Sequence, residues 1–183
     1  LLIMHTMLQP QGAVNVILQN LGIINTPLPF LQNALWARVT IIVINLWIGI
    51  PYTMLQVTGI LQNIPSDLYE AARVDGAGPA TIFFKITLPY MLFVTTPYLI
   101  TQFTGNINNF NVIYLLSSGG PTKVGDTAGQ TDLLVTWLYK LTVDQQYYNL
   151  GSVIGIFTFI ILAVIALVTY RNSGSYKNEE EFM

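Results

Sequence analysis

Long stretches of the chain contain no Asp, Glu, Lys, Arg or His. They cover residues 39–66, 86–122 and 145–170. Each stretch is longer than the roughly 20 residues that a helix needs to cross the hydrocarbon core of a membrane. A helix in a soluble protein would place polar or charged residues on its outer face at regular intervals. The pattern therefore predicts an all-α integral membrane protein, a polytopic bundle of spanning helices.

Proline, glycine and polar clusters separate these stretches and predict the order of the segments. Residues 1–8 are too short to span and begin without Met or a basic leader, so we expect them to be the end of a truncated transmembrane helix. The other expected segments are a connecting segment (9–35), a transmembrane helix (36–59), a charged loop (60–88), a second transmembrane helix (89–116), a loop with a short helix (117–148), a third transmembrane helix (149–171) and a tail (172–183).

Composition excludes several classes of function. Charged residues make up only 9% of the chain, against about 25% in a typical soluble domain, and apolar residues make up 52%. There is no cysteine and His5 is the single histidine, so we predict no catalytic residue, metal site or protein-held cofactor. No phosphate-binding G-x-x-x-x-G-K-[ST] motif occurs. The net charge of −2 implies nothing about nucleic acid, and we expect no nucleic-acid partner.

The charged loop contains a short predicted helix that begins at Ser66, with the Ser66 hydroxyl as its cap, and ends at about Asp75. Glu70 and Arg73 have the spacing of an ion pair on this helix. Gly76 is suited to ending it, because glycine adopts a left-handed conformation without strain. One expected face consists of Leu68, Ala71, Ala72 and Asp75.

Polar side chains recur at helical spacing in the first two predicted spans. The first stripe consists of Asn45, Gly49, Tyr52 and Gln56, and the second of Thr95, Tyr98, Gln102, Asn106 and Asn109. Amides in hydrocarbon are costly unless they are paired or hydrated. The stripes therefore favour either a polar cavity for a neutral, hydroxyl-rich ligand or hydrogen bonds that hold the helices together.

The loop sequence resembles the coupling loop of bacterial binding-protein-dependent ABC importers. The matching positions are Glu70-Ala71-Ala72, then Gly76 after three intervening residues and, after nine more residues, Ile86-x-Leu88-Pro89, which is the family spacing. The resemblance implies a transport subunit, not an enzyme, in the bacterial cytoplasmic membrane with a cytoplasmic C-terminus. It places the loop (60–88) and the tail in the cytoplasm and segments 9–35 and 117–148 outside.

This resemblance also implies partners. A dimer of ATPase subunits would bind ATP and receive the loop at its coupling residues, Glu70, Ala71, Ala72, Asp75 and Gly76. A second permease subunit, an extracytoplasmic sugar-binding protein and the lipid bilayer complete the expected set, with alternating access as the mechanism.

The spans most resemble the sugar-contacting helices of the larger permease in the maltose/maltodextrin branch of this family. The residues that match the branch's sugar contacts are Asn45, Ile48, Gly49, Tyr52, Gln102, Asn106 and Asn109. Gln102 replaces a smaller hydroxyl residue and Gly105 replaces an aromatic, so another neutral sugar remains an alternative. From a different class, an ATPase-independent channel or secondary transporter is the main competitor, and a membrane enzyme is a third.

Overall fold

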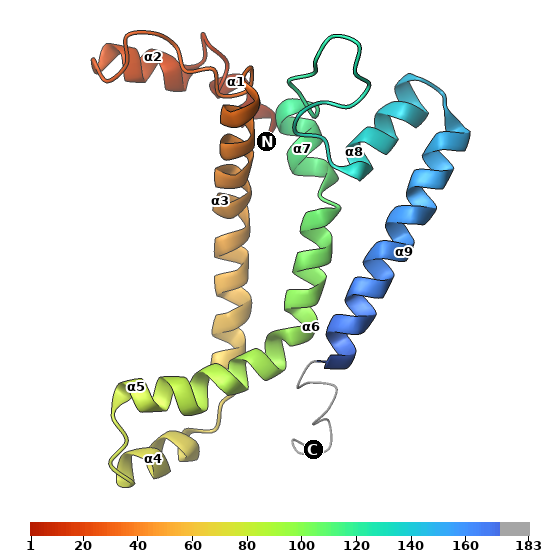
Figure 1. Ribbon diagram of the computed structural model, residues 1–183. Helices are drawn as coiled ribbons and strands as arrows, with labels where there is room; N and C mark the ends of the chain where they lie inside the picture. Colours follow the sequence, from red (N-terminus) through yellow and green to blue (C-terminus); the bar gives the residue numbers. More distant parts are fainter. Residues whose placement is uncertain (173–183) are drawn as a thin grey trace. The chain divides into compact units, whose positions relative to one another are not determined.

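The computed structural model describes residues 1–172, which are helical with connecting loops and contain no β-strand (Figure 1). The predicted tail (172–183) therefore lies outside the described residues from position 173 onward. The elements are α1 (Leu2–Met7), α2 (Ala13–Asn20), α3 (Ala34–Leu61), α4 (Ser66–Val74), α5 (Pro79–Ile82), the π-helical turn η1 (Phe83–Thr87), α6 (Leu88–Ile107), α7 (Phe110–Ser117), α8 (Leu134–Tyr139), the π-helical turn η2 (Lys140–Asp144) and α9 (Tyr148–Asn172).

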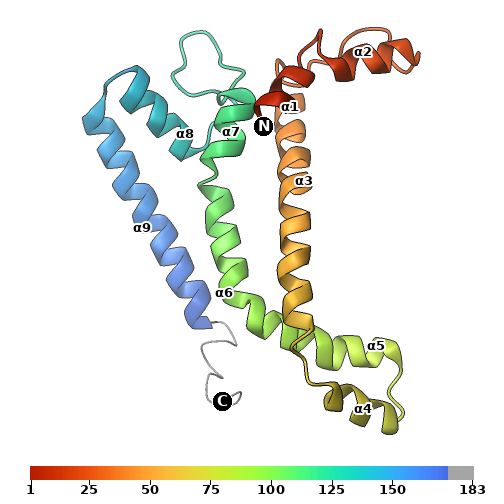
Figure 2. The same cartoon turned by 180° about the vertical axis from the view of Figure 1, so that it is seen from behind.

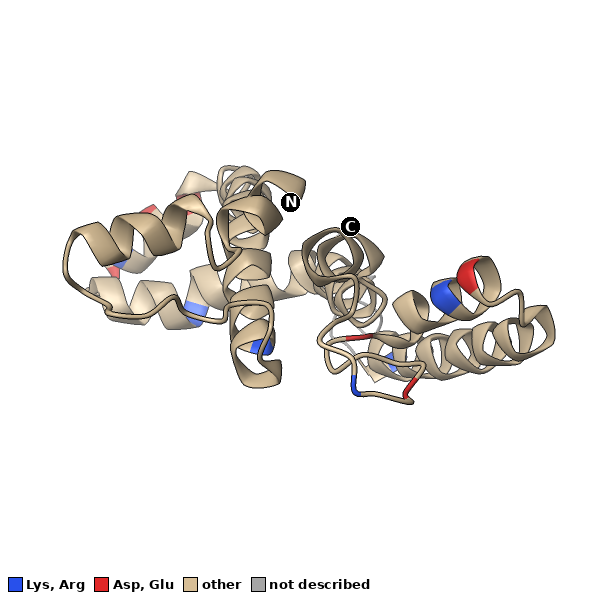
Figure 3. Cartoon of the chain, turned by 90° about the horizontal axis from the view of Figure 1, so that it is seen from above, with Lys and Arg blue, Asp and Glu red and all other residues tan. Residues whose placement is uncertain are grey.

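In this part of the chain, three helical stretches are long and apolar enough to cross a membrane, judged by length and composition. They are Ala34–Leu61, Pro79–Ser117 and Tyr148–Asn172. Figure 3 marks the charged residues, which are few and separated by long uncharged helices.

The chain divides into two compact units. Among the described residues, the first consists of Leu1–Trp47 with Gly105–Ile161, and the second of Ile48–Thr104 with residues 162–172. The core of the first unit is a cluster of buried aliphatic side chains from the loop before α3, from α3 and from α7: Leu31, Ile41, Ile44, Val112, Ile113 and Leu116. α1 packs against α7, and the His5 Nδ1 lies 2.6 Å from the Leu116 carbonyl oxygen, which accepts a hydrogen bond from the ring N–H.

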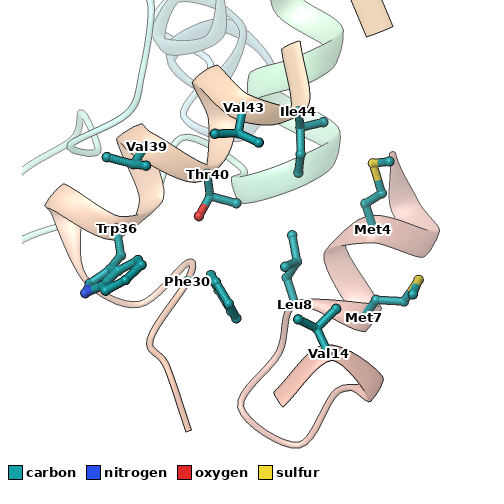
Figure 4. Close-up of a pocket in the computed structure, with 10 residues that line it drawn as sticks. All are labelled: Met4, Met7, Leu8, Val14, Phe30, Trp36, Val39, Thr40, Val43 and Ile44. Carbon is teal, nitrogen blue, oxygen red and sulfur yellow. The ribbon is translucent and has the colours of Figure 1, made fainter. Parts of the chain in front are cut away.

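An apolar cavity of about 430 Å³ lies in the first unit, between α1, α2 and the first half of α3 (Figure 4). Its lining residues are Met4, Met7, Leu8, Val14, Phe30, Trp36, Val39, Thr40, Val43 and Ile44. The Thr40 hydroxyl and the Trp36 indole N–H are the polar side-chain groups in this lining. A cavity with so few hydrogen-bonding groups does not suit a hydroxylated ligand, and none of the predicted substrate residues lines it.

The loop between α7 and α8 is held by a buried ion pair. Lys140 Nζ lies 2.8 Å from Asp132 Oδ2, and the two side chains are 15% and 3% exposed. The Asp132 carboxylate also accepts hydrogen bonds from the Gly129 N–H and the Thr136 hydroxyl. The helical spacing of residues 131–141 places Asp132 and Lys140 on one polar side, and there the two charges pair with each other.

The expected second span over 89–116 is interrupted. α6 ends at Ile107 and a separate helix, α7, begins at Phe110. Asn109 caps α7, since its Oδ1 accepts the Val112 N–H at 3.2 Å. A capping side chain replaces the missing backbone acceptor at a helix start, so the chain changes direction here without leaving that N–H unsatisfied.

In the second unit, α4 lies beside the helix formed by α5 and η1 (Figures 1 and 2). Gly76, at φ +78°, makes the turn after α4, and Gly78 and Pro79 start α5. The long helix that continues into α6 bends in Figure 1, and Pro97 inside it lacks the N–H that a straight helix would use.

Candidate functional sites

Three asparagine side chains of the first unit form a connected hydrogen-bond chain. Asn45 Nδ2, on α3, donates to Asn106 Oδ1 at 2.7 Å. Asn109 Nδ2 donates to Asn45 Oδ1 at 3.0 Å. We call Asn45, Asn106 and Asn109 the amide cluster. The cluster joins α3 to the end of α6 and the start of α7, at the break between those two helices.

The amide cluster has the chemistry of a site for neutral hydroxyl groups. Each carboxamide offers two N–H donors and a carbonyl acceptor, so it can bond to either side of an O–H group. Asn106 is exposed, whereas Asn45 and Asn109 are half-buried. The same bonds also serve the alternative role, in which the amides hold α3 and α7 together.

The other predicted substrate residues belong to the second unit. Ile48 and Tyr52 are exposed on α3, and Gly49 and Gln102 are half-buried. Tyr52 lies beside Tyr98, with ring centroids 6.5 Å apart. The Tyr98 hydroxyl is 3.2 Å from Thr53 Oγ1, so this pair joins α3 to α6.

The predicted coupling residues lie on and just after α4. Glu70, Ala71, Asp75 and Gly76 are exposed, and Ala72 is half-buried. α4 therefore presents a free outer surface with two carboxylates, while the side that carries Ala72 turns toward the protein. A short exposed helix with a small central residue has the form of a helix that a partner groove receives.

Two local predictions for α4 were wrong. Pro65, not Ser66, is the cap residue, and the Ser66 hydroxyl donates to Asp67 Oδ1 at 3.4 Å. Glu70 and Arg73 do not lie within ion-pair distance of each other. Both side chains are exposed, and an exposed pair gains too little energy to fix two long side chains in one geometry.

Sequence reasoning missed Tyr69 and Thr87. The Tyr69 hydroxyl lies 3.3 Å from Thr87 Oγ1, across 18 residues of sequence, and both side chains are half-buried. The position of Tyr69 before Ala72, on the same side of α4, was the available signal. The partner could not be inferred, because the π-helical turn changes the direction of the Thr87 side chain.

The family model described as "Binding-protein-dependent transport system inner membrane component" matches residues 1–174. The chain belongs to this family. The expected family resemblance is therefore confirmed, and the chain is a component of a transport system rather than an enzyme.

Curated relatives of this permease family include sugar transporters. The galactooligosaccharides transport system permease protein GanP of Bacillus subtilis is 46% identical over 153 residues, which are 84% of this chain and 37% of that protein. The maltodextrin transport system permease protein MdxF of the same organism is 42% identical over 179 residues, covering 92% of this chain and 40% of that protein. The chain thus spans about two fifths of the length of these relatives.

The fold also matches a solved permease structure. A crystal structure of a bacterial alginate ABC transporter, in complex with an alginate pentasaccharide-bound periplasmic protein, aligns with a TM-score of 0.79 and 27% identity. The match covers 96% of this chain and 59% of that chain. It confirms the predicted fold class, an all-α polytopic permease.

Proposed function

We propose that the chain is part of the membrane-spanning permease of an ATP-binding-cassette importer for neutral oligosaccharides, with maltodextrins as the first candidate substrate. Alternating access, driven by a dimer of ATPase subunits, would move the sugar across the cytoplasmic membrane. A second permease subunit and an extracytoplasmic binding protein would complete the importer. The C-terminus would lie in the cytoplasm.

The proposed substrate class rests on the amide cluster, which lies in helical stretches without charged residues. No ionisable residue lies between 39 and 66 or between 86 and 122. A carboxylate or phosphate substrate would favour a cation along its path, because a buried anion needs a charged partner. Amides and tyrosine hydroxyls instead bind neutral hydroxyl groups without a net charge to neutralise.

In this proposal the amide cluster exchanges its internal hydrogen bonds for bonds to sugar hydroxyls. Asn45, Asn106 and Asn109 bond to one another when no sugar is present, which reduces the number of unpaired polar groups within the membrane. Ile48, Gly49, Tyr52 and Gln102 remain predicted contacts on the strength of the resemblance.

Galactooligosaccharides are the second candidate substrate. The relative that transports them is 46% identical, against 42% for the maltodextrin relative, so neither sugar is preferred by similarity alone. Both sugars are neutral and rich in hydroxyl groups, as the uncharged spans require. The acidic polysaccharide named for the structural match lacks a charged partner in the spans of this chain.

Competition during uptake tests the substrate class. Cells that express the complete importer would take up labelled maltotriose, with unlabelled maltodextrins, galactooligosaccharides and acidic alginate oligosaccharides as competitors. We expect a neutral glycan to compete and the acidic glycan to have no effect. No uptake of maltotriose, together with uptake of a labelled galactooligosaccharide, would select the second candidate.

The Asn106→Ala variant links the uptake to the amide cluster, with Asn108→Ala, just after the end of α6, as a matched control. Loss of one hydrogen bond to a sugar should reduce uptake about five- to ten-fold in Asn106→Ala and leave Asn108→Ala unchanged. Equal uptake by both variants would assign the cluster to helix packing only.

A further inference from the structure

We infer that Tyr69 and Thr87 are positioning residues that fasten the helix α4 to the arm formed by α5, η1 and α6, so that movement of α4 is passed to the arm. This inference rests on the proposed function, because it concerns how ATP hydrolysis on partner subunits is coupled to transport.

Thr87 differs from other threonines of the same long helix. Thr95, Thr96 and Thr104 each donate a hydroxyl proton to the backbone carbonyl four residues earlier. This local bond is the usual outcome for threonine within a helix, since the acceptor lies in the preceding turn. The Thr87 hydroxyl instead lies 3.3 Å from the Tyr69 hydroxyl on α4.

The π-helical turn supports this exception. Over Phe83–Thr87 the chain adopts π-helical geometry, and the Leu88 N–H donates to the Phe83 carbonyl. A π-helical turn adds one residue to the normal repeat and so changes the direction of the side chains near it. Such turns are rare and often occur at functional positions. Here the turn ends at the residue that meets Tyr69.

Few other contacts fix α4 to the arm. A cavity of about 360 Å³ separates them, and Tyr69, Ile82 and Thr87 are among its lining residues. The covalent connection from α4 to the arm passes through Gly76 and Gly78, and the backbone at Gly76 is in the left-handed region. A connection through two glycines bends easily, so it alone would let α4 rotate against the arm.

The Tyr69–Thr87 bond therefore provides a second point of attachment to the arm, in the N-terminal half of α4. Attached to the arm at two points, α4 moves as one body with it. Attached to the arm through the glycine connection alone, α4 could follow a partner without moving the arm. Loss of the Tyr69–Thr87 bond should therefore leave the docking of α4 on the ATPase subunits intact. It should lower the amount of sugar transported per ATP hydrolysed.

The test uses the full-length permease in the complete importer, reconstituted in liposomes. Tyr69→Phe and Thr87→Val each remove one hydroxyl group with little change of shape. We expect both variants to assemble normally and to hydrolyse ATP, with about five times less sugar transported per ATP. A five-fold change corresponds to about 1 kcal/mol, the net contribution of one hydrogen bond.

A double variant shows whether the two hydroxyl groups act together. If they form one link, Tyr69→Phe with Thr87→Val should be no worse than either single variant. Thr87→Ser keeps the hydroxyl group and should transport normally. The matched controls are Tyr148→Phe, an exposed tyrosine, and Thr96→Val, whose hydroxyl bonds to its own helix.

The outcomes separate this inference from the proposed function. If the unaltered importer shows no ATP-driven sugar uptake, the proposed function is wrong and the inference falls with it. If the unaltered importer transports sugar and the variants keep its ratio of transport to hydrolysis, only the inference is overturned. Loss of the ATPase subunits from the variant complexes would also overturn the inference, because Tyr69 and Thr87 would then be needed for binding the ATPase subunits.

Discussion

At the scale of single residues, Asn109 bonds in two directions. Its Oδ1 accepts the Val112 N–H and caps α7, and its Nδ2 donates to Asn45 in the amide cluster. Substitutions can separate these two bonds. Serine is as good a cap as asparagine but has no amide to reach Asn45, whereas alanine removes both functions.

Asn109→Ser and Asn109→Ala should consequently differ. We expect Asn109→Ala to lower the stability of the permease by about 1 kcal/mol relative to Asn109→Ser, through loss of the cap. Both variants should reduce uptake of a neutral oligosaccharide, because both lose the amide. Thermal unfolding in detergent and uptake by cells measure the two effects. Normal uptake by Asn109→Ser would show that its amide does not contact substrate.

Asp132 is the second residue whose environment makes a clear prediction. Its carboxylate is 3% exposed and bonds to Lys140, so Asp132→Ala leaves the Lys140 charge without its partner. We expect a loss of about 3 kcal/mol in stability, at the low end for a broken buried pair because Lys140 is 15% exposed. Asp126→Ala, in the exposed part of the same loop, is the control. Equal melting temperatures for the two variants would contradict the account.

At this scale, the chemistry of the predicted site was easier to infer than its geometry. The helical spacing of Asn106 and Asn109 placed them in one continuous stripe. The structure brings both to Asn45, but with a helix break between them. Residues 107–110 include no proline or glycine that would have predicted this break. The Asp132–Lys140 pair was missed because helical spacing cannot distinguish a solvated charge from one that is paired inside a loop.

At the scale of elements, the turn after α4 determines how α4 meets the arm. Gly76 has φ +78°, and a β-carbon there would meet no atom within 4 Å. The strain of any other residue would therefore come from the backbone alone, at about 1–2 kcal/mol. Gly78, in contrast, has an extended backbone (φ −74°, ψ 165°), and a β-carbon there also has open space.

This difference yields a matched pair of variants. Gly76→Ala should weaken the association of ATPase subunits or the coupling of hydrolysis to transport about ten-fold, because the strain shifts the end of α4. Gly78→Ala should have little effect. Co-purification of the ATPase subunits and the ratio of sugar transported to ATP hydrolysed check both variants. A normal Gly76→Ala importer would argue against a defined turn at this position.

The elements themselves followed from the sequence where local signals were strong. The predicted helix from Ser66 to about Asp75 corresponds to α4 at Ser66–Val74, with the left-handed Gly76 after it. The π-helical turns η1 and η2 were not predicted. A π-helical turn has no residue signature of its own, and its formation depends on the contacts that its side chains make.

At the scale of the whole molecule, the uncharged stretches were sufficient to predict the class. Segments of this length without ionisable residues fit membrane-spanning helices, and the described residues contain three helical stretches of that kind. The sugar could not be inferred in the same way. Neutral oligosaccharides share their hydroxyl chemistry, and specificity among them depends on the positions of a few groups.

Substrate-stimulated ATPase activity of the complete importer tests the central claim most directly. The full-length permease would be co-expressed with its partner subunits and assayed with its binding protein, first with maltodextrins and then with galactooligosaccharides. The account predicts that a neutral oligosaccharide increases ATP hydrolysis and that an acidic oligosaccharide does not. An assembled importer whose ATPase activity responds to no neutral sugar would contradict it.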